Sequence, residues 1–270
     1  MEALTQKPGW RDVLWLELQL LFFRATKEDL QQLGPRHLIF GLCCTWIVGI
    51  GRYWDNPRIS FPQSLGVSSV VYVFVLSLFL WLLIWPLRPQ NWTYLRVLTF
   101  ISLVSPPAII YAIPVENLNL NAANSINSWF LFIVALWRVA LLIFFLRRSG
   151  QLDVLSVITG TFLPLCLVVV ALTLLNLEKA TFNLMGGLHS ERTPNDQAYG
   201  TLILLSVVSL YLFIPLMVTY LVIIVVRVAH RKPLAKGIHY NQNLLSQELT
   251  FQPISHTEEK RSSTDSAELH

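Results

Sequence analysis

Long apolar runs separated by short polar segments organise this chain. Uncharged runs at 59–87, 97–115, 154–177 and 197–226 each exceed the roughly 18 apolar residues that are typical of a membrane-spanning helix. A further apolar run, at 128–146, is interrupted only by Arg138. The pattern therefore predicts five membrane spans, at about 64–86, 96–115, 128–146, 154–177 and 200–226.

A sixth candidate span lies at 38–54, "LIFGLCCTWIVGIGRYW". It is short, because only about 14 residues precede the charge of Arg52. A long arginine side chain can extend to the membrane surface, and Tyr53 and Trp54 are residues that anchor helices at the interface. We therefore test this candidate by the distribution of basic residues.

Loops on the cytoplasmic side of a membrane collect Lys and Arg. If 38–54 crosses the membrane, the two sides differ strongly. One side then carries Lys7, Arg11, Arg24, Lys27, Arg36, Arg88, Arg96, Arg147, Arg148, Arg227, Arg231, Lys232 and Lys236, and the other carries Arg52, Arg58, Lys179 and Arg192. If 38–54 does not cross, the same counting gives nine against eight. The charge bias therefore favours six spans with both termini in the cytoplasm.

The predicted fold class is an all-α membrane protein with three regions. Residues 1–36 form a cytoplasmic segment of interfacial and short helices, 37–228 form the six-span membrane domain, and 229–270 form a polar, disordered cytoplasmic tail. The stretches 116–128 and 178–199 are predicted as outer loops. No internal repeat is visible, so the inverted-repeat signature of many transporters is missing.

The first 36 residues do not read as a secretory signal. The apolar stretch "VLWLELQLLFF" at 13–23 carries Glu17 at its centre and lacks a small-residue cleavage site. We interpret it as a helix lying at the membrane surface. Thr26, with Asp29 three residues later, predicts the capped start of a short helix, and Gly34-Pro35 predicts its end and the start of the first span.

Composition agrees with a membrane location. The chain of 270 residues is 54% hydrophobic, only 13% charged and has a mean hydropathy of +0.53, whereas soluble domains are about a quarter charged. The net charge of +4 is explained by basic residues that face anionic lipid, so it does not indicate nucleic-acid binding. We expect an integral membrane protein, of a bacterial inner membrane, whose partners are the lipid bilayer and either another membrane protein or a second copy.

Arg138 is the residue that most needs an explanation. It lies about nine residues from either end of its predicted span, roughly 13 Å deep at 1.5 Å per residue. A charge at that depth costs about 2.5 to 3.5 kcal/mol on insertion scales, so it requires a partner. None of the six predicted spans contains Asp or Glu. An internal ion pair is therefore excluded unless another segment folds into the bundle.

Backbone carbonyls are the remaining partners within the spans. A proline in a helix frees the carbonyl four residues earlier. Pro106, Pro107, Pro164 and Pro215 lie near the middle of three spans, and they would free the carbonyls of Ser102, Leu103, Gly160 and Tyr211. The hydroxyls of Ser102, Ser105, Thr159 and Thr161 lie nearby in the sequence. These residues predict a polar region at mid-membrane around Arg138, with Ser102, Ser105 and Thr161 as candidate binding residues.

Three interpretations of Arg138 stay open. It braces the broken helices, it receives an anion or lipid head group in a midplane pocket, or it pairs with an acidic residue on a partner's transmembrane helix. The first is favoured, because freed carbonyls within the chain are sufficient to satisfy the charge.

Several chemistries lack their residues in this sequence. The spans contain no Asp or Glu for a proton relay or a zinc protease, and no phosphate-binding glycine loop is present. The three cysteines, Cys43, Cys44 and Cys166, all lie in predicted spans and have no metal-site spacing. We expect no cofactor, no metal and no catalytic residue. The favoured function is a non-enzymatic scaffold or assembly factor; the alternatives are a transporter or channel with a midplane pocket, and a lipid-modifying enzyme.

The segment "DLQQLGP" at 29–35, leading from a polar N-terminus into closely spaced spans, resembles the Yip1-like multi-pass proteins. The six-span count departs from the five that are usual in that family. "GRYWDNPR" at 51–58 and "SPPAIIYAIPVE" at 105–116 resemble segments of uncharacterised bacterial inner-membrane proteins. These resemblances imply a membrane location and transfer no site residue.

Overall fold

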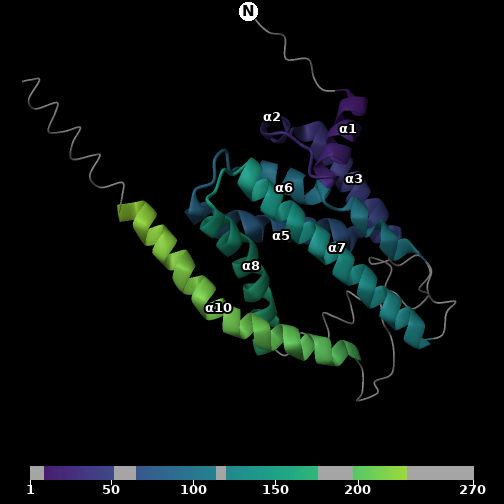
Figure 1. The fold of residues 1–270 in the computed structure, drawn as a ribbon. Coiled ribbons are helices and arrows are strands. Elements are labelled where there is room, and N and C mark those ends of the chain that lie inside the picture. The colour runs from purple at the N-terminus through teal and green to yellow at the C-terminus, as the bar shows by residue number, and fades with distance from the viewer. Residues whose placement is uncertain (1–8, 52–64, 114–119, 176–196, 230–270) are drawn as a thin grey trace, which may run out of the picture. The chain divides into compact units, whose positions relative to one another are not determined.

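The computed structural model describes residues 9–51, 65–113, 120–175 and 197–229 (Figure 1). The regular structure of these residues is entirely helical, as predicted. The elements are α1 (Trp10–Leu21), α2 (Lys27–Gln31), α3 (Pro35–Gly51), α5 (Val67–Ile84), η1 (Trp85–Leu87), α6 (Tyr94–Leu103), η2 (Pro106–Ala112), α7 (Leu120–Arg148), α8 (Val154–Leu174) and α10 (Gln197–Ala229). The chain divides into two compact units, Met1–Ile224 and Val225–His270, and every contact described below lies within the first. The tail predicted to be disordered is 229–270. Its first residue, Ala229, is the last residue of α10, and the rest lies outside the described residues.

Five stretches of the described chain are long and apolar enough to cross a membrane. They are Val67–Leu87, Tyr94–Ala112, Trp129–Arg148, Val154–Leu174 and Leu204–Ala229. Each overlaps one of the five spans predicted from the uncharged runs. The protein is therefore a polytopic, α-helical membrane protein.

Two predicted boundaries differ from the structure. Residues 38–51 of the sixth candidate lie in the apolar helix α3, whose 17 residues fall short of the five longer stretches, and residues 52–54 lie outside the described residues. The helix α7 begins at Leu120, inside the predicted outer loop 116–128. No Gly or Pro occurs between Leu120 and Arg148, so nothing in this segment ends the helix before its apolar part.

The predicted start of the short second helix is confirmed. The Thr26 hydroxyl accepts a hydrogen bond from the Asp29 backbone N–H at 3.2 Å, and the Asp29 carboxylate accepts one from the Thr26 N–H at 2.8 Å. The two residues thus satisfy each other's backbone donors, as a capping box does. The next helix, α3, begins at Pro35, also as predicted.

The helix α1 packs against other helices through one face. Val13, Leu16, Glu17 and Leu20 recur at intervals of three and four residues and are buried, and α1 contacts α3. At its end, the Trp137 indole of α7 donates to the Leu21 carbonyl at 3.1 Å. Trp137 lies eleven residues before the end of α7, roughly 16 Å along its axis. These contacts hold the end of α1 against α7. The predicted position of this helix at the membrane surface stays a prediction.

The helices α3 and α6 run side by side in the same direction. Thr45 of α3 bonds to Ser105 just beyond α6, with the two hydroxyl oxygens 2.7 Å apart. A methyl group placed on Gly41 would overlap Ser102, and one placed on Gly51 would lie 3.1 Å from Ala112 of η2. The absence of side chains at these glycines lets the backbones approach closely. From Gly41 to Gly51, the helix α3 therefore lies alongside α6 and then η2.

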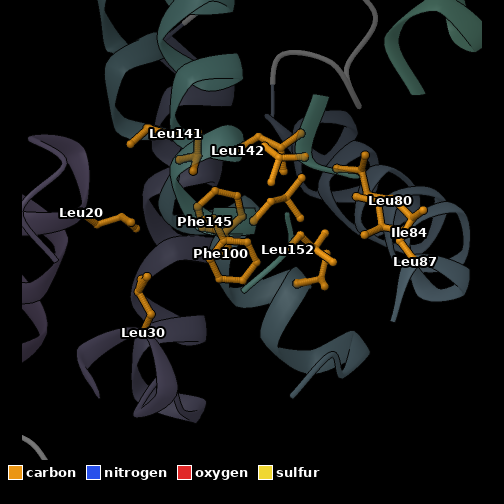
Figure 2. Close-up of a cluster of buried hydrophobic side chains, with 14 of the residues drawn as sticks. Leu20, Leu30, Leu80, Ile84, Leu87, Phe100, Leu141, Leu142, Phe145 and Leu152 are labelled. Atoms are coloured by element: carbon orange, nitrogen blue, oxygen red, sulfur yellow. The ribbon is translucent and has the colours of Figure 1, made fainter. Parts of the chain in front are cut away.

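Two short connections meet at one end of this unit. The Gln90 N–H, between α5 and α6, donates to the Gly150 carbonyl, between α7 and α8, at 2.9 Å. Close to this end lies the main hydrophobic core, which α1, α2, α5, α6, α7, α8 and α10 share. In this core the rings of Phe100 and Phe145 stack on each other (Figure 2), with their centroids 4.0 Å apart. The main hydrophobic core therefore lies near the two connections, which are flanked by the basic residues Arg88, Arg96, Arg147 and Arg148.

Candidate functional site

Arg138 lies in α7 with its side chain half-buried, and it binds a backbone carbonyl as predicted. Its Nε donates a hydrogen bond to the carbonyl of Val104 at 3.3 Å. Val104 directly follows the last residue of α6 and lies two residues before the start of η2. The guanidinium of α7 is thus connected to the break between α6 and η2.

The proline pair explains why this carbonyl is available. In a continuous helix the Val104 carbonyl would accept from the N–H of Ala108. That N–H instead donates to the Ser105 carbonyl at 3.0 Å, because η2 has the tighter 3₁₀ pattern. The Val104 carbonyl is therefore left without its helical donor.

The carbonyl that binds Arg138 is not one of the two predicted at this break. It assumed a continuous helix in which Pro106 and Pro107 free the carbonyls of Ser102 and Leu103. In the structure α6 ends at Leu103, and the Ser102 carbonyl accepts from the Ser105 N–H at 3.2 Å. Val104 and Ser105 lie between α6 and η2, and this interruption of the helix leaves the Val104 carbonyl available to Arg138.

Ser102 and Ser105, both predicted as binding residues, are buried and engaged with their own helix or with α3. The Ser102 hydroxyl donates to the Thr99 carbonyl at 2.8 Å. The Ser105 hydroxyl bonds to Thr45, and Thr45 also donates to the Gly41 carbonyl at 2.9 Å. The Ser105 hydroxyl therefore connects α3 to the segment after α6, and the Ser102 hydroxyl bonds within α6.

Thr161, the remaining predicted binding residue, lies in α8. Its side chain is fully buried, and its hydroxyl has no hydrogen-bond partner, like that of Thr159 in the same helix. The structure therefore does not bond Thr161 to Arg138. Its predicted binding role stays a prediction.

The other prolines do not break their helices. Pro164 is buried inside α8 and Pro215 is exposed inside α10, and both helices continue through them. Of the three predicted breaks, the structure has the one at Pro106 and Pro107. Neighbouring helices and small backbone adjustments tolerate proline within a membrane helix, which accounts for the two continuous ones.

A cavity of about 270 Å³ lies on another face of α7. It is lined by apolar side chains only, those of Phe23, Ile133, Leu136, Trp137 and Ala140. At 3.6 residues per turn, Leu136 and Ala140 project from the side of α7 roughly opposite to Arg138. Ile133 and Leu136 are about half exposed, so the cavity lies at the outer surface of α7. The apolar cavity and the buried cation are therefore separate features of one helix.

Glu17 is a polar residue that the sequence analysis used only as evidence against a signal peptide. Its side chain is 4% exposed, and neither carboxyl oxygen has a hydrogen-bond partner. Removal from water raises the pKa of this carboxyl from 4.5 to about 8. Its position between Leu16 and Leu20 on one helical face was the signal that marked it as buried.

No known protein family, no curated protein and no solved structure matches this chain. The resemblances noted from short segments therefore remain predictions. Among the described residues, no group of three or more His, Cys, Asp or Glu side chains is arranged to hold a metal ion. The function must be argued from the contacts of the chain itself.

Proposed function

We propose that the protein is a non-enzymatic membrane scaffold that binds a partner's transmembrane helix on the outer face of α7. The observation that carries this proposal is the division of α7 into two sides. Arg138 reaches inward to the Val104 carbonyl, while the cavity on the opposite side is apolar and lies at the surface. Arg138 then acts as a brace that holds α7 to the break after α6.

The outer face of α7 extends beyond the cavity. Trp129, Phe132, Ile133 and Leu136 follow one another at helical spacing, and each is 45% exposed or more. The rings of Trp129 and Phe132 meet edge to face at 6.0 Å. Helices associate in a membrane through close van der Waals packing. The side chains of a partner helix can pack in this way into the cavity beside Phe23 and Trp137. These features support a helical partner.

The polar groups near the break support a scaffold over a transporter. A transport site at mid-membrane needs polar groups that face a cavity. The hydroxyls of Ser102 and Ser105 instead bond within the α3–α6 contact. Specific solute flux through the purified protein in liposomes would favour the transporter alternative.

We further propose six spans, with α3 as the first. The helix α3 is roughly 25 Å long at 1.5 Å per residue. It lies in step with Tyr94–Ala112, a stretch long enough to cross the membrane, so the two occupy the same depth. At the other end, the Arg96 guanidinium donates to the Gln31 carbonyl at 3.1 Å, so the start of α3 lies near the basic loops. This arrangement supports cytoplasmic termini and agrees with the charge bias. A reporter fused at residue 58 that reads as cytoplasmic would contradict it.

The scaffold proposal is tested by filling the cavity. Ala140→Phe places a ring in the hollow, and Ala171→Phe, at an exposed position of α8, is the matched control. We expect a stoichiometric membrane protein to co-purify in mild detergent with the wild type and the control, and to be lost from Ala140→Phe. Retention by Ala140→Phe, or release of bound lipid alone, would contradict a partner helix at this site.

The bracing role of Arg138 is tested by Arg138→Met. If Arg138 only joins α7 to the break, an apolar residue of similar length should be tolerated, because the cost of burying the charge is removed as well. We expect partner retention to stay unchanged and thermal stability to be unchanged or raised. A folded variant that has lost its partner, and that Arg138→Lys rescues poorly, would instead assign Arg138 to binding.

A further inference from the structure

Glu17 stands apart from the other acidic residues of the described chain. Both of its carboxyl oxygens are buried and neither has a hydrogen-bond partner, whereas Asp12, Asp29 and Asp153 each accept a backbone N–H at a helix start. A buried carboxylate without a partner is strongly unfavourable, and such a group becomes neutral instead. The surroundings of Glu17 therefore suit a carboxylic acid and not a carboxylate.

The surroundings come from two helices. Glu17 lies close enough to Cys44 of α3 for its charge to act on that thiol. One turn further along α1, the Leu21 carbonyl accepts from Trp137 of α7. Cys44 is nine residues into α3, roughly 14 Å along its axis. The Glu17 carboxyl thus lies near the middle of α3, one turn of α1 away from the contact with α7.

The titratable and charged groups on those helices do not neutralise it. In α3 they are Arg36, His37, Cys43 and Cys44, and in α7 they are Arg138, Arg147 and Arg148. The His37 Nδ1 accepts from the Gly34 N–H, the Arg138 Nε donates to Val104, and Arg148 lies over the Phe144 ring. The six predicted spans contain no Asp or Glu, so an acidic side chain can enter the helix bundle only from another segment, and α1 brings in Glu17.

We propose that Glu17 is a proton-binding site within the helix bundle, and that the bound proton holds α1 in its docked position against α3 and α7. Loss of the proton leaves a charge in an apolar contact, and undocking of α1 returns that charge to water. Undocking would also separate Phe22 and Phe23 from Trp137 and Phe144 on α7. The function of this switch does not depend on the scaffold proposal.

The pH dependence of α1 docking follows from the raised pKa of Glu17. The pKa of Glu17 is about 8 when α1 is docked and near its ordinary value of 4.5 when the side chain is in water. Docking is therefore fully favoured below about pH 4.5, weakens about tenfold per pH unit up to about pH 8, and changes no further above that. Because the docked pKa is the raised one, acid stabilises the docked state.

Hydrogen exchange of the full-length protein in lipid nanodiscs tests this. We expect the protection of the α1 amides, corrected for the intrinsic effect of pH on exchange, to fall about tenfold per pH unit between pH 5 and 8. Glu17→Gln carries a neutral side chain of the same shape and should show the same protection at every pH. Glu28→Gln, at an exposed position of α2, is the matched control and should behave as the wild type does.

Infrared spectroscopy supplies an independent measurement. We expect the C=O band of a protonated carboxylic acid to disappear with a midpoint near pH 8, and to be absent from Glu17→Gln. The proposal is overturned if that band is missing from the wild type at pH 6, or if Glu17→Gln keeps the pH dependence of α1 exchange.

Discussion

The contact between α3 and α6 and the helix α10 show two ways in which an apolar helix is held in this protein. Half of the most apolar part of Tyr94–Ala112 is buried, against 17% for Leu204–Ala229. The buried face of α3 consists of His37, Gly41, Thr45 and Gly49, which are four residues apart. The helix α10 exposes large apolar side chains along most of its length.

The difference between the α3–α6 contact and α10 follows from the lipid that surrounds both. In a bilayer an apolar side chain gains little by leaving lipid for another apolar surface, so helix contacts depend on close packing and hydrogen bonds. The α3–α6 contact has both, through Gly41 and through the bond between Thr45 and Ser105. In α10, Tyr220 donates to the Leu83 carbonyl at 2.7 Å and Ser206 accepts from Thr173 at 3.0 Å. More apolar surface therefore does not mean a more specific contact.

The largest effect is expected from Gly41→Val. A methyl group at this position would lie 2.9 Å from the Ser102 backbone carbon, so the helices would have to move apart. We expect a loss of about 1–3 kcal/mol, the usual cost of overpacking, measured by thermal or denaturant unfolding in detergent. Cys43→Val, at an exposed position of the same helix, is the control. Equal stability of the two variants would contradict close packing between α3 and α6.

A smaller effect is expected from the hydroxyl pair. In a double-mutant cycle of Thr45→Val and Ser105→Ala, we expect a coupling energy of about 0.6 kcal/mol and not above about 1.7 kcal/mol. The cycle isolates the bond because Thr45 also donates to Gly41 within α3. Additive single effects would show that backbone proximity alone holds the two helices together.

An effect no larger than that of the hydroxyl pair is expected in α10. Tyr220→Phe removes the hydrogen bond to Leu83 and should cost about 0.6 kcal/mol, the average for such bonds in membranes. Tyr211→Phe, at a position that is 77% exposed, should leave stability unchanged. If both substitutions have the same effect, Tyr220 does not help to hold α10.

Local features were predictable from the sequence. Both hydrogen bonds of the capping box join Thr26 and Asp29, so residues three apart in the sequence specified the start of α2. The five longer apolar stretches were specified in the same way, because a bilayer requires about 18 or more consecutive apolar residues. The need of Arg138 for a carbonyl partner also followed from the sequence, since the spans contain no acidic residue.

The identity of that partner did not follow. Which carbonyl is available depends on how the backbone resolves Pro106 and Pro107, and the 3₁₀ turn assigned the Ala108 N–H to Ser105 and left Val104 for Arg138. Similarly, the hydroxyls of Ser102 and Ser105 were predicted around Arg138, but the approach of α3 bonded Ser105 to Thr45.

The sequence by itself determined that this is a helical membrane protein, where α2 and α3 begin and which cation required a partner, because each of these depends on residues close together in the chain. Only the tertiary structure decided that Glu17 is buried where α1 packs on α3, with no hydrogen-bond partner, and that the two sides of α7 differ in chemistry. Those properties depend on which helices lie next to each other. In lipid, neighbours are selected by the shape of small residues and by single hydrogen bonds, and an apolar pattern carries little information about either.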